Sequence, residues 1–232
     1  MILIQEHWLS AFDKDVIQDI LPKWGNQCIC KDEKMEETDF EKRPTPGGSV
    51  ATLWKESLSP YMNNHTILES SRIAINTLDL PGCPLCIIIC YLPSGSSKEA
   101  TEKFMEDIDR LNELIDRFSP THEFLVMGDL NEDHFNRRNK KEMAMMQLMT
   151  SQHLTDMGLS CKGEVTYDNP HLNHRCHIDH ALVKKRLLKA EWSQVKILSQ
   201  DIAYVSLNTL YHHPVKIDLS APKLSKSLAL AA

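Results

Sequence analysis

Residues 85–92 form a continuously apolar run with Ile87-Ile88-Ile89 at its centre. A strand with one face in solvent alternates polar and apolar side chains, whereas a strand covered on both faces does not. The run therefore predicts a strand whose two faces both pack against other layers of the protein. This requirement constrains the fold more than any other part of the sequence does.

A helix and a second strand follow this run. The sequence Ser96-Ser97-Lys98-Glu99 has the spacing of a capping box, in which Ser96 begins the helix and Glu99 bonds back to it. Pro120 ends the helix, and an apolar strand at 124–127 comes next. The apolar residues that recur at helical spacing are Phe104, Ile108, Leu111, Ile115 and Phe118. The order of strand, helix and strand predicts an α/β layer.

Most of the remaining sequence is strand-like. A short helical turn is expected at 13–21, and polar residues with two prolines indicate a loop at 31–46. A second helix is expected at 141–152, where the stripe of Met143, Met146 and Met149 should face the core. Further strands are expected at 2–5, 50–54, 67–78, 165–167, 176–183, 195–198 and 215–219. The pattern predicts an α/β fold in which two mixed sheets pack face to face with helices outside.

The composition is that of a soluble globular protein, with 42% hydrophobic and 25% charged residues. We expect one domain over residues 1–220 and a disordered tail at 221–232. No apolar run approaches the ~20 residues that a membrane span needs. No basic leader or cleavage site precedes the first strand, and seven cysteines then indicate reduced thiols. These features predict an intracellular protein that is not secreted.

Carboxylate and amide groups stand at the ends of two expected strands. Asp129 and Asn131 lie two residues apart, so on an extended backbone they face the same side. Asp129 could take a proton from water, and Asn131 could donate hydrogen bonds to a phosphate. The same spacing is also common in turns, where the side chain bonds its own backbone. Glu6, at the end of strand 2–5, offers the hard oxygen ligand that Mg²⁺ prefers.

An imidazole and a phenol complete this set. Asp179 lies inside an apolar strand, where a carboxylate needs a partner such as His212, although an exposed strand edge is the alternative. An Asp–His pair makes the imidazole more basic, and the protonated ring can stabilise charge on a phosphate. Tyr91 ends the buried strand before a Pro/Gly turn and could bond a phosphate oxygen or only line an interface. Together these groups fit a metal-assisted phosphodiesterase.

These segments, taken in order, resemble the endonuclease/exonuclease/phosphatase superfamily, and within it the apurinic-type endonuclease domain of non-long-terminal-repeat retrotransposons. The resemblance extends from Ile2 to Leu219. It implies a four-layer α/β/β/α sandwich and an endonuclease that uses Mg²⁺ (or Mn²⁺), acts on DNA and resides in the nucleus. We assume a monomer and expect no membrane partner. The matching stretches are 3–9, 47–51, Cys90-Tyr91-Leu92-Pro93-Ser94-Gly95, Met127-Gly128-Asp129-Leu130-Asn131, Thr166-Tyr167, Ile178-Asp179-His180-Ala181-Leu182-Val183 and His212-His213-Pro214-Val215.

The resemblance also implies roles for single residues. Glu6 would bind the metal, and Tyr91 would be the active-site tyrosine. Asp129 would activate or position the attacking water, with Asn131 as its partner in the phosphate site. The positions that match the orienting aspartate and the catalytic histidine are Asp179 and His212.

The net charge of −6 does not favour a general nucleic-acid coat protein. A nuclease can nevertheless carry a locally basic face that contacts phosphates. Basic residues follow the Asp129 segment, and a solvated loop or helix end is the alternative to a binding role. The candidates for nucleic-acid binding are Arg137, Arg138, Lys140 and Lys141.

The chain departs from the family pattern at two places. Leu210-Tyr211-His212 stands where the family has Ser-Asp-His, so a phenol replaces a carboxylate of the metal site. The chain also begins at what corresponds to the second strand of the family. Both departures predict impaired metal binding. The alternatives to an active nuclease are a degraded retroelement-derived domain that only binds, and a phosphatase of the same superfamily.

Two further groups have the composition of a metal site. Histidines recur at positions 171, 174, 177 and 180, but on a strand His177 and His180 would face opposite sides, so we do not expect a zinc site there. Cys83-Pro84-Leu85-Cys86 has the spacing of a metal or redox pair, with Cys28-Ile29-Cys30 as a second candidate. Separate thiols without a function are the alternative.

Overall fold

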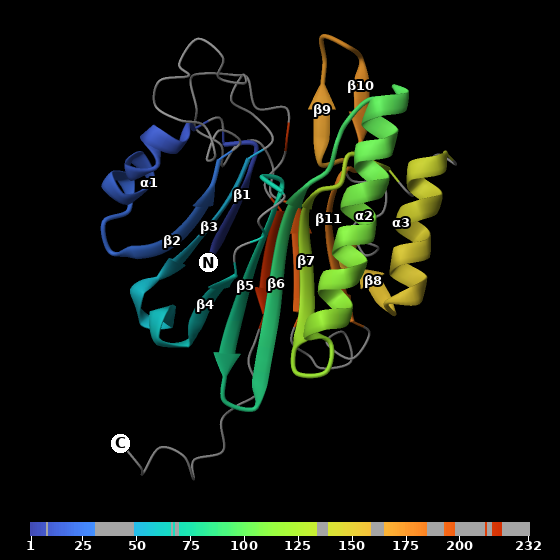
Figure 1. The fold of residues 1–232 in the computed structure, drawn as a ribbon. Helices are drawn as coiled ribbons and strands as arrows, with labels where there is room; N and C mark the ends of the chain where they lie inside the picture. The colour runs from blue at the N-terminus through green and yellow to red at the C-terminus, as the bar shows by residue number, and fades with distance from the viewer. Residues whose placement is uncertain are drawn as a thin grey trace.

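The computed structural model describes residues 1–7, 9–30, 49–65, 67, 70–133, 139–158, 165–184, 193–197, 212 and 215–219. Two sheets pack face to face and helices cover their outer sides (Figure 1). The smaller sheet has the order β1 (Ile2–Gln5), β3 (Val50–Lys55), β2 (Trp24–Ile29). The larger sheet has the order β4 (Met62–His65), β5 (Ile73–Leu80), β6 (Cys83–Tyr91), β7 (Glu123–Asp129), β11 (Asp179–Lys184), β8 (Leu154–Asp156).

Shorter elements complete the described part of the chain. Two two-stranded sheets pair β9 (Tyr167–Asn169) with β10 (His174–Cys176) and β12 (Ser193–Ile197) with β13 (Val215–Leu219). The helices are α1 (Asp15–Ile20), α2 (Lys98–Phe118) and α3 (Lys140–Ser151), with 3-10 turns at Ala11–Asp13 and Glu56–Tyr61. Among the described residues, no helix is long and apolar enough to cross a lipid bilayer.

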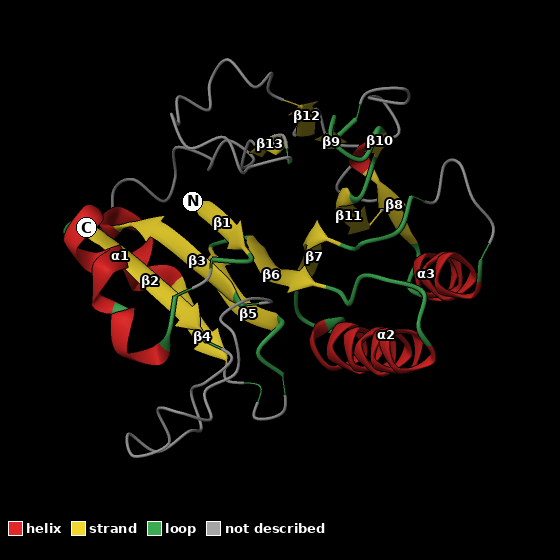
Figure 2. Cartoon of the chain, turned by 90° about the horizontal axis from the view of Figure 1, so that it is seen from above, coloured by secondary structure: helices red, strands yellow, loops and turns green. Residues whose placement is uncertain are grey.

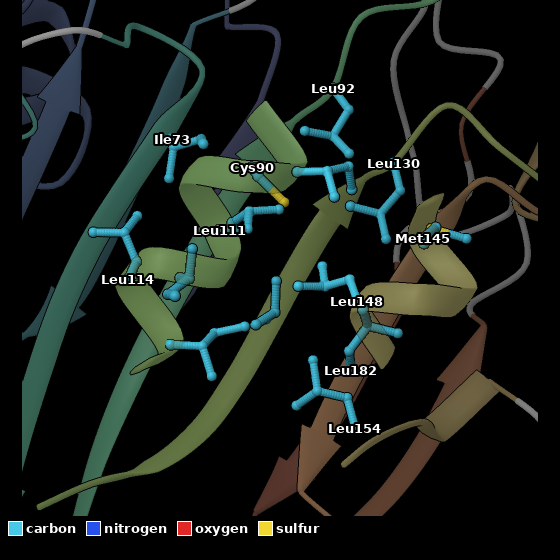
Figure 3. Packing of buried hydrophobic residues seen from close by; sticks show 14 of the residues in the cluster. Ile73, Cys90, Leu92, Leu111, Leu114, Leu130, Met145, Leu148, Leu154 and Leu182 are labelled. Carbon is cyan, nitrogen blue, oxygen red and sulfur yellow. The ribbon is translucent and has the colours of Figure 1, made fainter. Parts of the chain in front are cut away.

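Strand β6 is covered on both faces, as its continuous apolar sequence predicts. Ile88 packs into the core under α2 and α3, whereas Ile87 and Ile89 face the smaller sheet. Figure 2 shows α2 and α3 on one side of the larger sheet and the smaller sheet on the other. Figure 3 shows the core between α2, α3 and the sheet, where Leu111, Leu148 and Leu182 converge.

The smaller sheet is also covered on both faces. Its inner face carries Ile29 and Val50 against Ile89 of the larger sheet. Its outer face carries Cys28 and Leu53 against α1. The expected α/β fold, with four layers in the order helix, sheet, sheet and helices, is therefore present in the described residues (Figure 2).

Helix α2 begins one residue later than its sequence suggests. The hydroxyl of Ser97, rather than that of Ser96, accepts the N–H of Ala100 at 3.1 Å and caps the helix. Glu99 consequently occupies the second helical position and pairs with Lys103 at 2.7 Å instead of closing a capping box.

The prediction for the methionine stripe of α3 is wrong for Met143 and Met146, whereas Met149 is partly buried and packs against the core. Met143 and Met146 are 66% and 51% exposed, and the buried face of the helix carries Ala144, Met145 and Leu148. The methionines give α3 two apolar faces with nearly the same spacing. The face that packs with α2 is the one with Ala144, Met145 and Leu148. The loop expected at 31–46 and the tail expected at 221–232 lie outside the described residues.

Candidate active site

Three polar side chains lie side by side at one end of the central strands of the larger sheet. Strands β6 and β7 run parallel and place Tyr91 opposite Asp129. Strand β11 runs antiparallel to β7 and places Asp179 opposite the same Asp129. The ends of these strands lie together in Figure 1. The registers of two strand pairs therefore bring residues from three distant parts of the sequence to one row of the sheet.

Asp129 is the most buried member of this row, with 3% of its surface exposed. One of its oxygens, Oδ1, accepts the backbone N–H of Asn131 at 2.8 Å. Burial, together with the negative charges of Asp179 and Glu6, raises the pKa of Asp129 to about 7. A carboxyl group with this pKa can exchange a proton near neutral pH, as a general base must.

His212 and Asp179 form the expected pair. The distance from Nδ1 of His212 to Oδ2 of Asp179 is 3.0 Å, and Nε2 of the same ring lies 3.9 Å from Oδ2 of Asp129. Burial opposes the charged imidazole, but the hydrogen bond and the charge of Asp179 prevail and raise the pKa of His212. The ring also packs edge-on against Tyr167, with 5.0 Å between ring centroids. The imidazole is thus held between two carboxylates with its cationic form favoured.

The backbone at this pair is fixed by a residue for which the sequence suggested no role. Thr166 is fully buried, and its hydroxyl accepts the N–H groups of Ile178 and Asp179, each at 3.0 Å. Thr166 therefore fixes the segment that presents the carboxylate to His212. The short Thr166-Tyr167 match was the signal in the sequence, although it gave no indication of this function.

Glu6 and Tyr91 meet from the two different sheets. The phenol of Tyr91 donates a hydrogen bond to Oε1 of Glu6 at 3.1 Å. Glu6 has a left-handed backbone conformation with φ of 54°, and its N–H donates to the carbonyl of Ser49 at 2.7 Å. Burial and the charges of Glu6 and Asp129 raise the pKa of Tyr91, so the phenol remains a donor.

Asn131 and Asp129 form the local turn that the Asp-x-Asn spacing offered as one alternative, and the role of Asn131 at a phosphate stays a prediction. Its N–H closes a turn onto Asp129, and its own backbone is left-handed with φ of 52°. Its side-chain amide donates to the carbonyl of Leu92 at 2.7 Å and also hydrogen-bonds Tyr91. The amide therefore joins the ends of β6 and β7 at the site.

Gly128 makes the close approach of these strands possible. It has φ of 147°, and a Cβ added at this position would lie 1.8 Å from the carbonyl oxygen of Cys90. A side chain at residue 128 would therefore separate β6 from β7 directly beside Asp129.

Of the four basic residues predicted to bind nucleic acid, the structure describes the two lysines. Lys141 is buried, and its ammonium group donates to the carbonyls of Pro93 and Gly95, each at 2.7 Å. Its donors are thus used within the fold, and the binding of nucleic acid by Lys141 stays a prediction. Lys140 is exposed at the start of α3. Arg137, Arg138 and Tyr211 lie outside the described residues.

The expectation that His177 and His180 diverge is wrong. Their ring centroids are 5.1 Å apart, because His177 precedes β11 and does not share its alternation. His180 is bonded at both ring nitrogens, to Asp156 at 2.7 Å and to the carbonyl of Glu132 at 2.9 Å. These bonds tie β11 to its surroundings in the interior of the protein.

A model of the Endonuclease/Exonuclease/phosphatase family matches residues 1–211 of the chain. The match covers most of the sequence, and the chain therefore belongs to this family. No curated protein matches it in sequence.

Solved structures with the same fold share little sequence with the chain. The AP endonuclease LMAP from Leishmania major has a TM-score of 0.71 at 14% identity, over 95% of this chain and 78% of that one. The 3′ phosphatase NExo from Neisseria, bound to a product DNA hairpin, has a TM-score of 0.66 at 15% identity, over 94% and 88%. The endonuclease domain of TRAS1, a telomere-specific non-LTR retrotransposon, has a TM-score of 0.65 at 11% identity, over 95% and 86%.

Proposed function

We propose that the protein is a metal-dependent phosphodiester hydrolase that acts on DNA. The observation that carries this proposal is the contact of His212 with both Asp179 and Asp129 at the sheet edge, because it combines a candidate base with a cationic imidazole. Asp129 would accept a proton from the attacking water. His212 would stabilise negative charge on a phosphate oxygen, and Asp179 would hold its ring in place.

The residues of the site fit a divalent cation. The charges of Asp179 and Glu6 both disfavour ionisation of the buried Asp129, and a nearby cation would offset this repulsion. Glu6 would be the residue that holds Mg²⁺ or Mn²⁺, with Tyr91 fixing its carboxylate. When bound, the ion would polarise a phosphate oxygen of the substrate.

DNA is the proposed substrate for two reasons. A structural neighbour, the 3′ phosphatase NExo, is described as bound to a product DNA hairpin. The exposed Lys140, at the start of α3, also provides a charge that could contact a phosphate backbone. The replacement of a family aspartate by Tyr211 is expected to weaken the metal site, so the activity of the native chain would be low.

Nicking of supercoiled plasmid by the purified protein tests the proposal, with Mg²⁺, with Mn²⁺ and with chelator. Metal-dependent nicking is expected, with a decrease of about 10²–10⁴-fold in His212→Asn. His153→Asn is the matched control, because His153 is exposed and has a left-handed backbone that asparagine tolerates.

A Tyr211→Asp variant distinguishes a nuclease with a weakened metal site from a protein without nuclease activity. An increase of nicking in this variant would locate the defect at the metal site. Binding of duplex DNA with no nicking by either protein would refute the proposal in favour of a binding domain. Release of inorganic phosphate from small phosphoesters, without nicking, would refute it in favour of a phosphatase.

A further inference from the structure

A second group of ligand-type side chains lies on the outer face of the smaller sheet. His7 follows β1, and Cys28 and Cys30 lie at the end of β2. The Sγ atom of Cys28 is 3.4 Å from Nε2 of His7 and 3.8 Å from Sγ of Cys30. The three ligand atoms all lie within 4.8 Å of one another. The cysteine pair of the sequence thus gains a third ligand, whereas Cys83 and Cys86 belong to no such group among the described residues.

The strands explain why these side chains meet. Cys28 and Cys30 are two residues apart and share the face of the sheet that packs under α1. Ala51 of β3 stands between the outer strands, opposite Cys28 on one side and Ile4 on the other. Its single methyl group leaves little bulk between β2 and the residues that follow β1. His7 can therefore contact Cys28 from the far side of β3.

The two separations that involve Cys28 match those of ligands around one tetrahedral zinc ion. With Zn–S of about 2.3 Å and Zn–N of about 2.0–2.1 Å, tetrahedral angles place two sulfurs about 3.8 Å apart and sulfur and nitrogen about 3.6 Å apart. The observed values are 3.8 and 3.4 Å. We propose that His7, Cys28 and Cys30 bind one zinc ion, at a site separate from the carboxylates of the candidate active site.

The donor set favours zinc over the ion of the active site. Thiolate and imidazole groups select soft or borderline ions, whereas Mg²⁺ takes oxygen ligands. The hydrogen bond from Cys30 outweighs burial and, with His7, lowers the pKa of Cys28, in the direction that favours a metal-binding thiolate. Cys30 would lose its proton on binding, and three protein ligands would leave one position for water.

Binding has a defined consequence for His7. Its Nδ1 accepts the N–H of Leu9 at 3.2 Å, so the ring proton is on Nε2, which contacts the carbonyl of Ile29 at 3.1 Å. Coordination through Nε2 moves this proton to Nδ1 and breaks the bond from Leu9. Because His7 directly follows Glu6, the zinc ion would also fix the chain next to the proposed ligand of the catalytic metal.

Cobalt substitution tests the proposal in the full-length protein, reduced and stripped of metal. Titration with Co²⁺ in excess Mg²⁺ should produce a thiolate-to-cobalt charge-transfer band that saturates at one equivalent and disappears when Zn²⁺ is added. The band should be lost in Cys28→Ser and Cys30→Ser. It should persist in Cys83→Ser, which removes a half-buried thiol on β6. Absence of the band in the native protein, or its persistence in Cys28→Ser, would overturn the proposal.

A measurement on the native chain covers the case in which the serine variants fail to fold. X-ray absorption at the zinc edge of the loaded protein should show two sulfur neighbours. A shell of nitrogen and oxygen alone would overturn the proposal and would instead point to the buried group of Asp156, His177 and His180.

Discussion

Replacement of Asp129 by asparagine should stabilise the metal-free protein while removing its proposed base. The folded protein raises the pKa of this carboxyl group from 3.8 to about 7. A group whose pKa is raised by folding stabilises the folded state most at pH values below 3.8. That contribution is lost as the pH rises to about 7, because the unfolded chain ionises freely and the buried group does not.

The size of the effect follows from the two pKa values. At about 1.4 kcal/mol for each pH unit between them, the ionised carboxylate destabilises the fold by about 4 kcal/mol above pH 7 and by less than half of this at pH 5. An asparagine has no charge to bury, and its side-chain oxygen can still accept the N–H of Asn131. Asp129→Asn should therefore increase the free energy of unfolding, and the increase should be larger at pH 8 than at pH 5.

Urea denaturation in the presence of chelator, at pH 5 and at pH 8, measures this difference. Asp109→Asn is the matched control, because Asp109 is exposed on α2 and should change stability by less than about 0.5 kcal/mol at either pH. An Asp129→Asn protein that is no more stable than the native one at pH 8, or whose gain shrinks as the pH rises, would refute the assignment of a buried, repelled carboxylate.

Three other substitutions test the surroundings of the site. Gly128→Ala should lower the free energy of unfolding, measured by thermal melting, by more than about 4 kcal/mol. Gly82→Ala is the control and should lower it by only about 1–2 kcal/mol, because nothing lies within 4 Å of a Cβ at that position. Thr166→Val should destabilise by about 2 kcal/mol through two buried N–H groups left without their acceptor, and equal stability of Thr166→Val and the exposed Thr150→Val would contradict this role. Lys140→Ala should reduce the slope of log K for duplex DNA binding against log salt concentration by about one, because one phosphate contact is lost. An unchanged slope would exclude Lys140 from the interface.

The sequence was most informative where strands are apolar and end in polar groups. Tyr91 and Asp129 could be placed together because each ends a recognisable strand, whereas Asp179 was expected inside a strand at 176–183 and instead begins β11. The register that aligns them is a tertiary property, and no local pattern in the sequence specifies it.

Other elements could not be predicted for identifiable reasons. Strand β2 contains Gly25, Asn26 and Gln27 and lacks an apolar alternation, and it forms because it pairs along the full length of β3. Gly25 also lies under Trp54, where a Cβ would be 2.3 Å from the indole nitrogen. The contact of His7 with Cys28 joins residues 21 positions apart across an intervening strand, so spacing alone could not reveal it.

The path of the chain through β6, α2 and β7 places the polar residues of the candidate site at one end of the larger sheet and the connecting turns at the other. The two ends should therefore differ in how well they tolerate an insertion. Strand β6 rises to Tyr91, α2 returns along the sheet, and β7 rises again to Asp129, so the turn at 119–122 lies at the end remote from these residues (Figure 1). The hairpin at 81–82, between β5 and β6, lies at the same end. A tag, a fluorescent domain or a second binding module inserted there would leave the carboxylates and His212 in place, whereas the same insertion after Leu92 or Leu130 would disturb them directly.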